Sequence, residues 1–130
     1  MSDRLLLDER IRADGKLART WGRAAAGRLR LDEEDGPTGE LSAAALDRVM
    51  CRYGLPLDDG VALVGDALDL GDGRRLRRLR HHAPVDATGR DYLVWERPGE
   101  PPLAVLATHA TAALRYLVLR LEAEKSPSGI

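Results

Sequence analysis

A stripe of apolar side chains recurs at helical spacing through residues 111–124. The stripe consists of Leu114, Leu117, Val118 and Leu121, and it is widened by Tyr116 and Leu119. Side chains at positions i, i+3, i+4 and i+7 share one face of an α-helix. A helix with so broad an apolar face either lies deep in a core or continues into a subunit interface. The pattern therefore predicts a C-terminal helix that packs on a second layer of structure.

Strand signals precede this helix. Residues 92–95 and 103–106 are rich in β-forming side chains. Residues 98–102, which separate these two runs, contain Pro98, Pro101 and Pro102 and cannot continue a strand ladder. The pattern predicts two strands joined by a proline-rich connection.

A second hairpin is predicted around the sequence Gly71-Asp72-Gly73, because glycine and aspartate tolerate the positive φ of a tight turn. Its first arm would include residues 68–70, and its second arm would be residues 74–82. On a strand Leu76 and Leu79 face opposite sides, whereas on a helix they share a face. Residues 58–70 fit either a short helix or a strand that leads into the turn.

The N-terminal half reads as helical. Residues 3–30 are predicted to form helix with a break near Gly15, and residues 32–37 an acidic turn. A further helix is predicted from a cap at Thr38 through residues 41–53, ended by Gly54. Its apolar face consists of Leu46, Val49, Met50 and Tyr53.

These elements predict a single α+β domain spanning residues 1–130. Within it we expect a helical N-terminal segment, an acidic linker, a core and a frayed tail, at residues 1–31, 32–37, 38–124 and 125–130. Antiparallel strands at about 67–82 and 91–108 would pack on the C-terminal helix and on helix 41–53.

A run of arginines precedes His81 and His82, in a chain whose formal net charge is only -1. The run consists of Arg74, Arg75, Arg77, Arg78 and Arg80. Guanidinium groups packed this closely must be solvated, neutralised by nearby acids or directed at an anionic partner. We favour neutralisation, by the acidic turn and the aspartates before the run, over docking of an acidic protein. Nucleic acid ranks third, because the pI is about 6.3 and no aromatic residue interrupts the run.

The usual catalytic arrangements are missing from the sequence. No serine lies in a strand-to-helix elbow, and Cys51 is expected to be a buried, inert thiol inside a helix. A two-histidine, one-carboxylate site would need His82 or His81 to meet His109, with Asp86 or Asp91 as the carboxylate. Surface histidines explain these residues better, so we predict no metal and no cofactor.

The chain is expected to be cytoplasmic and not to enter a membrane. Its single cysteine rules out an internal disulfide and fits a reducing compartment. The apolar part of the N-terminus is too short for a secretory signal, and no apolar run approaches the ~20 residues that span a bilayer.

The leading functional hypothesis is a small non-catalytic protein that binds another protein or a second copy of itself. Its apolar anchors would be Trp95, Tyr116 and Leu119, because large apolar groups dominate interface energies. The arginine run would steer the encounter. One alternative is a nucleic-acid-binding accessory protein that uses the same arginines, and a second is a small-ligand or metal enzyme around His82, His109 and Asp91.

Overall fold

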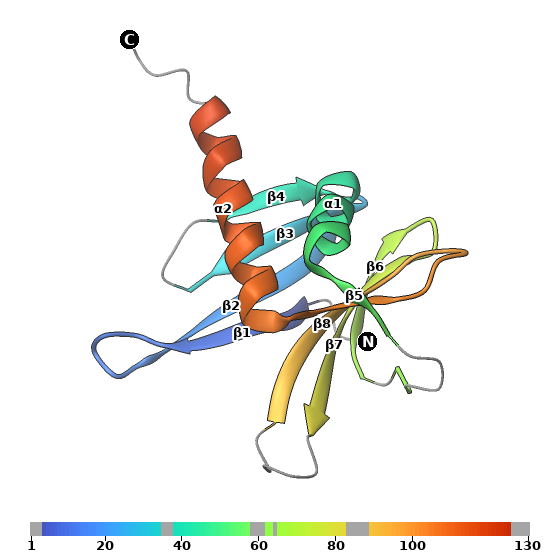
Figure 1. Cartoon of the computed structure of the whole chain (residues 1–130). Helices are drawn as coiled ribbons and strands as arrows, with labels where there is room; N and C mark the ends of the chain where they lie inside the picture. Colours follow the sequence, from blue (N-terminus) through green and yellow to red (C-terminus); the bar gives the residue numbers. More distant parts are fainter. Residues whose placement is uncertain (1–3, 35–37, 58–61, 64, 83–88, 126–130) are drawn as a thin grey trace.

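The computed structural model describes residues 4–34, 38–57, 62–63, 65–82 and 89–125. In these residues the chain forms two antiparallel sheets and two helices (Figure 1), which confirms the predicted α+β class. The first sheet has the order β1-β2-β3-β4, with strands Arg4–Ile11, Leu17–Ala25, Arg28–Glu33 and Gly39–Ser42. The second has the order β5-β9-β8-β7-β6, with strands Leu55–Pro56 (β5), Ala67–Gly71 (β6), Arg74–His82 (β7), Gly89–Glu96 (β8) and Leu103–Leu106 (β9). The helices are α1, Ala43–Tyr53, and α2, Ala107–Lys125.

The N-terminal helix predicted over residues 3–30 is wrong, because this segment forms β1, β2 and most of β3. Its leucines follow the period of two that a half-buried strand requires: Leu5 and Leu7 point inward on β1, as do Leu29 and Leu31 on β3. Gly15 and Gly27, which weakened the helix, adopt positive φ of 81° and 77° in the connections between strands.

One hydrophobic core unites both sheets and both helices. Its largest fully buried side chains include Leu7, Leu29, Leu31, Leu41, Leu46, Met50, Leu76, Leu93, Trp95 and Leu114. Figure 1 shows α2 lying across the first sheet with α1 beside it. The N-terminal segment is therefore part of the core, and the predicted boundary of the core at residue 38 is wrong. The linker predicted at 32–37 is also wrong at its start, since β3 includes residues 32–33, and residues 35–37 lie outside the described part of the chain.

Helix α1 confirms the helix predicted within residues 41–53, but it begins at Ala43, because residues 41–42 end strand β4. The backbone N–H of Ala45 donates to Oγ of Ser42 at 3.1 Å, so Ser42 caps the helix in place of the predicted Thr38. Leu46, Val49 and Met50 are buried, as their spacing indicated, whereas Tyr53 is 53% exposed.

Helix α2 begins at Ala107, four residues before the predicted start at 111. Leu114 and Val118 are buried, and Leu117 and Leu121 pack partly against the core. The helix packs against the first sheet at β1 and β4 and against the second at β8 and β9. The predicted packing of the C-terminal helix on a sheet is thus confirmed.

The strands predicted after residue 67 are also confirmed. Strands β6 and β7 form the expected hairpin, and Gly71, Asp72 and Gly73 all adopt positive φ in its turn. Strands β8 and β9 contain the predicted runs 92–95 and 103–106 and pair in antiparallel register. Of the ambiguous segment 58–70, residues 67–70 belong to β6, and 58–61 and 64 lie outside the described residues.

Candidate functional site: a groove between the two helices

The arginine run is divided by the pleat of β7. Leu76 is fully buried, and Arg78 lies on the same face of the strand. The Arg78 guanidinium donates to the carbonyl oxygen of Leu6 and pairs with the carboxylate of Asp91. Arg77 points to the other face. The five arginines therefore do not form one continuous surface.

Arg77 is neutralised on that other face. Its Nε donates to Oε2 of Glu96 at 3.1 Å, and its Nη1 donates to the carbonyl oxygen of Gly65 at 2.7 Å. The neutralising carboxylates, Asp91 and Glu96, belong to the neighbouring strand β8. For Arg77 and Arg78, the prediction that the acidic turn or the aspartates before the run supply the neutralising carboxylates is therefore wrong.

The remaining arginines of the run differ in exposure. Arg75 is exposed and lies opposite Asp69 on β6 and Glu96 on β8, so acidic residues flank it on both sides. Arg74 is half-buried, and the side chain of Arg80 lies outside the described part of the structure. Acidic residues beside Arg75, Arg77 and Arg78 favour the interpretation that the run is neutralised within the fold.

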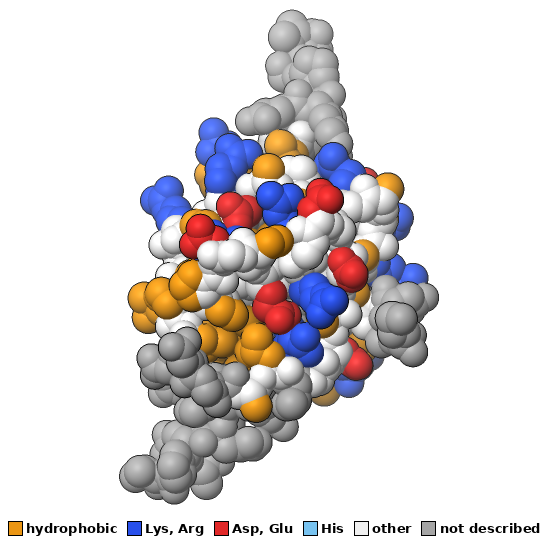
Figure 2. Space-filling model, turned by 90° about the vertical axis from the view of Figure 1, so that its right-hand side faces the viewer, with side chains coloured by type: hydrophobic (Ala, Val, Ile, Leu, Met, Phe, Trp, Pro, Cys, Tyr) orange, Lys and Arg blue, Asp and Glu red, His pale blue; other side chains and the backbone are white. Residues whose placement is uncertain are grey.

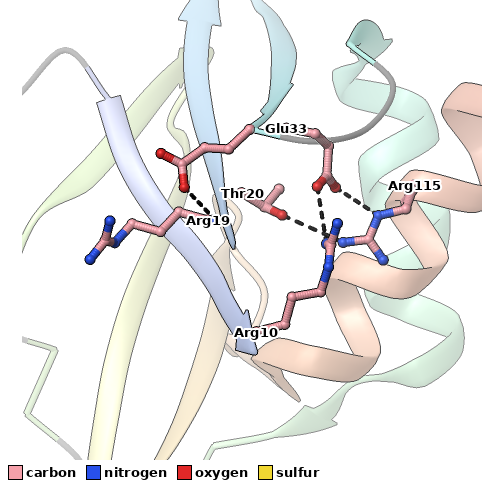
Figure 3. A network of polar contacts seen from close by, with 6 residues as sticks. Arg10, Arg19, Thr20, Glu33 and Arg115 are labelled. Carbon is pink, nitrogen blue, oxygen red and sulfur yellow. Dashed lines mark hydrogen bonds and ion pairs between the residues drawn. The ribbon is translucent and has the colours of Figure 1, made fainter. Parts of the chain in front are cut away.

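The carboxylate of Glu33 forms the centre of a buried polar network (Figure 3). Its Oε2 accepts a hydrogen bond from Arg10 at 3.1 Å, and its Oε1 accepts one from Arg115 Nε at 2.7 Å. Arg115 also reaches the hydroxyl of Thr20, at 3.5 Å. The ion pair between Glu33 on β3 and Arg115 on α2 joins that helix to the first sheet. Because both oxygens of Glu33 accept hydrogen bonds and its side chain is 0% exposed, this carboxylate is not placed to contact a substrate.

Asp8 lies near this network, at a β-bulge between Leu6 and Asp8 that interrupts the alternation of β1. Both Leu7 and Asp8 are consequently buried. Burial raises the pKa of Asp8 above its ordinary value of 3.8, and the positive charges of Arg115, Arg78 and Arg10 offset only part of that rise.

The raised pKa of Asp8 predicts a specific dependence of stability on pH. The folded state binds the Asp8 proton more tightly than the unfolded state does, so stability is lost as pH rises from about 3.8 through the folded pKa. Asp8→Asn should therefore be more stable than wild type at pH 7, and this advantage should shrink to nothing as pH falls below 3.8. Urea unfolding of both proteins between pH 3 and pH 7 measures the difference, with the exposed Glu40→Gln as control. A wild-type advantage that grows with pH would contradict the prediction.

The predicted metal or ligand site is not assembled as the sequence suggested. Asp91 pairs with Arg78 and lines a different pocket from the groove that His109 lines. Among the described residues no group of three or more His, Cys, Asp or Glu side chains could hold a metal ion. The side chain of His82 lies outside the described part.

Trp95 cannot serve as the predicted interface anchor, because it is fully buried in the core. Its indole Nε1–H donates to Oδ1 of Asp47 on α1 at 2.8 Å, which joins the second sheet to that helix. The reason is strand alternation: Leu93 and Trp95 share the inward face of β8. Cys51, predicted to be buried, is exposed instead.

Tyr116 and Leu119 are exposed, at 60% and 51%, as an interface role requires. Of these two residues, Tyr116 lines a groove of about 1040 Å³ between α1 and α2. Its floor is formed by β5, β8 and β9, through Leu55, Tyr92, Ala104, Val105 and Leu106. The α1 wall consists of Ala45, Arg48, Val49, Arg52 and Tyr53, and the α2 wall of His109, Ala112, Ala113, Tyr116, Leu117, Arg120 and Leu121.

The chemistry of this groove differs from that of the surface elsewhere. In the view of Figure 2, arginine and acidic side chains are interspersed over much of the surface, beside a patch of hydrophobic side chains. The groove combines an aliphatic interior with three arginines and His109, and none of the described residues that line it is aspartate or glutamate. All three tyrosines of the chain line it.

Sequence reasoning identified Tyr116 as an interface residue and His109 as a candidate ligand, and it missed the other residues of the groove. The sequence did contain a signal for the α2 wall. Its residues recur at helical spacing, at i, i+3, i+4, i+7, i+8, i+11 and i+12 from His109, and they lie beside the buried stripe of Leu114 and Val118. The α1 wall could not be identified in the same way, because alanine and arginine at helical spacing resemble any solvated helix face.

No helix in the described residues is long and apolar enough to cross a membrane. The chain matches no protein-family model, no curated protein and no solved structure.

Proposed function

We propose that this chain is a non-catalytic binding protein whose groove between α1 and α2 takes an apolar segment of another protein. The single observation that carries the proposal is the gathering of every tyrosine of the chain, with three arginines, around one aliphatic groove. Tyrosine and arginine are enriched at protein interfaces and among the residues that dominate binding energy.

The exposure of the groove residues supports a macromolecular ligand. Tyr53, Leu55 and Tyr116 are 53%, 73% and 60% exposed, and all three line the groove. Covering each of these side chains would contribute on the order of 1 kcal/mol, at about 25 cal/mol per Å² of apolar area removed from water. A partner that spans the groove would cover all three at once.

A second copy of the chain is a poorer occupant than a different protein. In a two-fold symmetric dimer the same surface patch is used on both subunits. Two groove rims that each carry Arg48, Arg52 and Arg120 would then face each other, and like charges brought together across an interface oppose association.

The nucleic-acid alternative has less support from the arginine run than the sequence suggested, because Arg77 and Arg78 are engaged within the fold. The tyrosines and arginines of the groove could in principle stack bases and bind phosphates. Its interior, however, is built largely from alanine, valine and leucine, which suit an aliphatic ligand better than a charged backbone.

Site-specific photo-crosslinking tests the proposal. Benzoylphenylalanine would replace Tyr116 in the groove and, as a control, Ala44, which is exposed on α1 and does not line the groove. We expect a protein adduct from position 116 and none from position 44, with the crosslinked peptide identified by mass spectrometry and its binding reproduced with the purified partner.

A second pair of variants tests the groove without a crosslinker. Ala112→Trp places bulk into the groove from an exposed helix position, and Ala44→Trp makes the same change outside it. Ala112→Trp should weaken binding of the identified partner at least tenfold, and Ala44→Trp should leave it unchanged. Equal adducts at both positions, or an adduct at 116 that nuclease removes, would overturn the proposal.

A further inference from the structure

We infer that the segment bound in the groove is an amphipathic α-helix of about 12 residues whose apolar face is bordered by acidic side chains. The inference rests on the proposed function and specifies the partner's chemistry. Three properties of the groove carry it: the spacing of its wall residues, the short edge strand in its floor and the charge of its rim.

Both walls present side chains at the spacing used for packing between helices. On α1 the wall residues follow i, i+3, i+4, i+7 and i+8 from Ala45, and on α2 they follow the same series from His109. Such stripes form the ridges and grooves into which the side chains of another helix fit. Small residues on both walls, Ala45, Ala112 and Ala113, allow the backbone of a third helix to approach closely.

The length of the walls sets the length of the bound helix. From His109 to Leu121 the α2 wall extends about 18 Å, at a rise of about 1.5 Å per residue. The α1 wall, from Ala45 to Tyr53, extends about 12 Å on the same basis. A helix of roughly three turns fills this span, with anchors at i, i+3 or i+4 and i+7.

An extended peptide fits the floor less well. Adding a strand requires a sheet edge with free backbone donors and acceptors. The edge strand here, β5, has only two residues, and Pro56 has no N–H to donate. The next N–H, that of Leu57, already donates to the carbonyl oxygen of Pro102 at 2.9 Å.

A small ligand also fits less well. Pockets for small molecules measure roughly 300–1,000 Å³ and bury most of the surface of the ligand. The groove, at about 1040 Å³, lies at the upper limit of that range. Leu55 in its floor is 73% exposed, so a small molecule there would remain largely open to solvent.

The positive charge of the groove rim favours acidic residues on both sides of the apolar face of the bound helix. Arg48 and Arg52 are one helical turn apart on α1, where two like charges oppose each other. On sheet surfaces of this protein, arginines are paired with acids, as in Arg28 with Glu40 and Arg23 with Asp32. Within the described residues neither Arg48 nor Arg52 forms an ion pair with a carboxylate. Carboxylates on a bound helix would supply that pairing.

Selection from a display library of random 16-residue peptides tests the inference without a known partner. The full chain is the bait, and peptides that also bind Ala112→Trp are removed. We expect the enriched peptides to carry apolar residues at helical spacing with aspartate or glutamate beside them, and to gain helical circular dichroism on binding.

The tightest selected peptide then tests the charge directly. Arg48→Gln/Arg52→Gln should weaken its binding roughly tenfold and reduce the salt dependence of the affinity. The control, Arg23→Gln/Arg28→Gln, removes two exposed arginines from the first sheet and should leave the affinity unchanged.

The outcomes separate the two claims. Groove-dependent peptides that are neutral or basic, that bind as extended chains, or that tolerate loss of Arg48 and Arg52 would overturn the inference and leave the proposed function standing. Selection of no peptide that distinguishes wild type from Ala112→Trp would overturn the proposed function and the inference with it.

Discussion

Replacing Trp95 with alanine should lower the free energy of unfolding by about 3–5 kcal/mol, because the change leaves a large cavity in the core. Trp95 is 0% exposed and packs in the cluster shared by both sheets and both helices. The substitution also leaves Oδ1 of Asp47 without the indole N–H that lies 2.8 Å away. Since domains of this size are stable by only about 5–15 kcal/mol, the loss is a large fraction of the total. Urea unfolding followed by circular dichroism measures it.

Two further variants separate the effect of core burial at Trp95 from the loss of any aromatic side chain. Trp95→Phe keeps most of the volume and removes the indole donor, so it should fold and lose less stability than the alanine variant. Tyr116→Ala removes an aromatic side chain that is 60% exposed, and its stability should stay within about 0.5 kcal/mol of wild type. If Trp95→Ala and Tyr116→Ala cost the same, Trp95 is not the core residue described above.

Glu33→Ala should lower the free energy of unfolding by about 3 kcal/mol, because it leaves two guanidinium groups beside each other without their shared carboxylate. Arg10 and Arg115 approach the two oxygens of Glu33 at 3.1 and 2.7 Å, and the Glu33 side chain is fully covered. The loss should be accompanied by faster amide exchange in α2, because Arg115 belongs to that helix.

Glu40→Ala is the matched control for this network. Glu40 pairs with Arg28 across 3.4 Å, but both side chains are nearly half exposed, at 44% and 45%. An exposed pair of this kind contributes about 0–1 kcal/mol. Equal losses in Glu33→Ala and Glu40→Ala would show that the buried network contributes no more than a surface pair.

The parts of the fold that the sequence predicted are those in which local pattern and tertiary packing agree. The hairpin around Asp72 needs positive φ at residues that tolerate it, and the stripe from Leu114 to Leu121 repeats at helical spacing. In the N-terminal segment the two agree on β3, where Leu29 and Leu31 alternate, but less clearly on β1. Leu5, Leu6 and Leu7 form an uninterrupted apolar run, and the bulge beside Asp8 breaks the alternation that would have marked a strand.

The candidate site was predicted only in part, because a groove depends on which faces of distant elements meet. Tyr116 was found because it widens an apolar stripe in one helix. Arg48 and Arg52 have no such signal, and they become part of a site only where α1 lies beside α2 over β9. Trp95 was misassigned because its size suggested an anchor, whereas the inward face of β8 was fixed by pairing with β7 and β9.

Hydrogen exchange of the full chain, with and without the crosslinked partner or the selected peptide, distinguishes the groove from the arginine strand as the binding surface. If the groove is the site, added protection should fall on α1, β9 and α2, with the largest change between His109 and Leu121. Protection confined to the β6–β7 hairpin and its arginines, with the two helices unchanged, would contradict the proposed function.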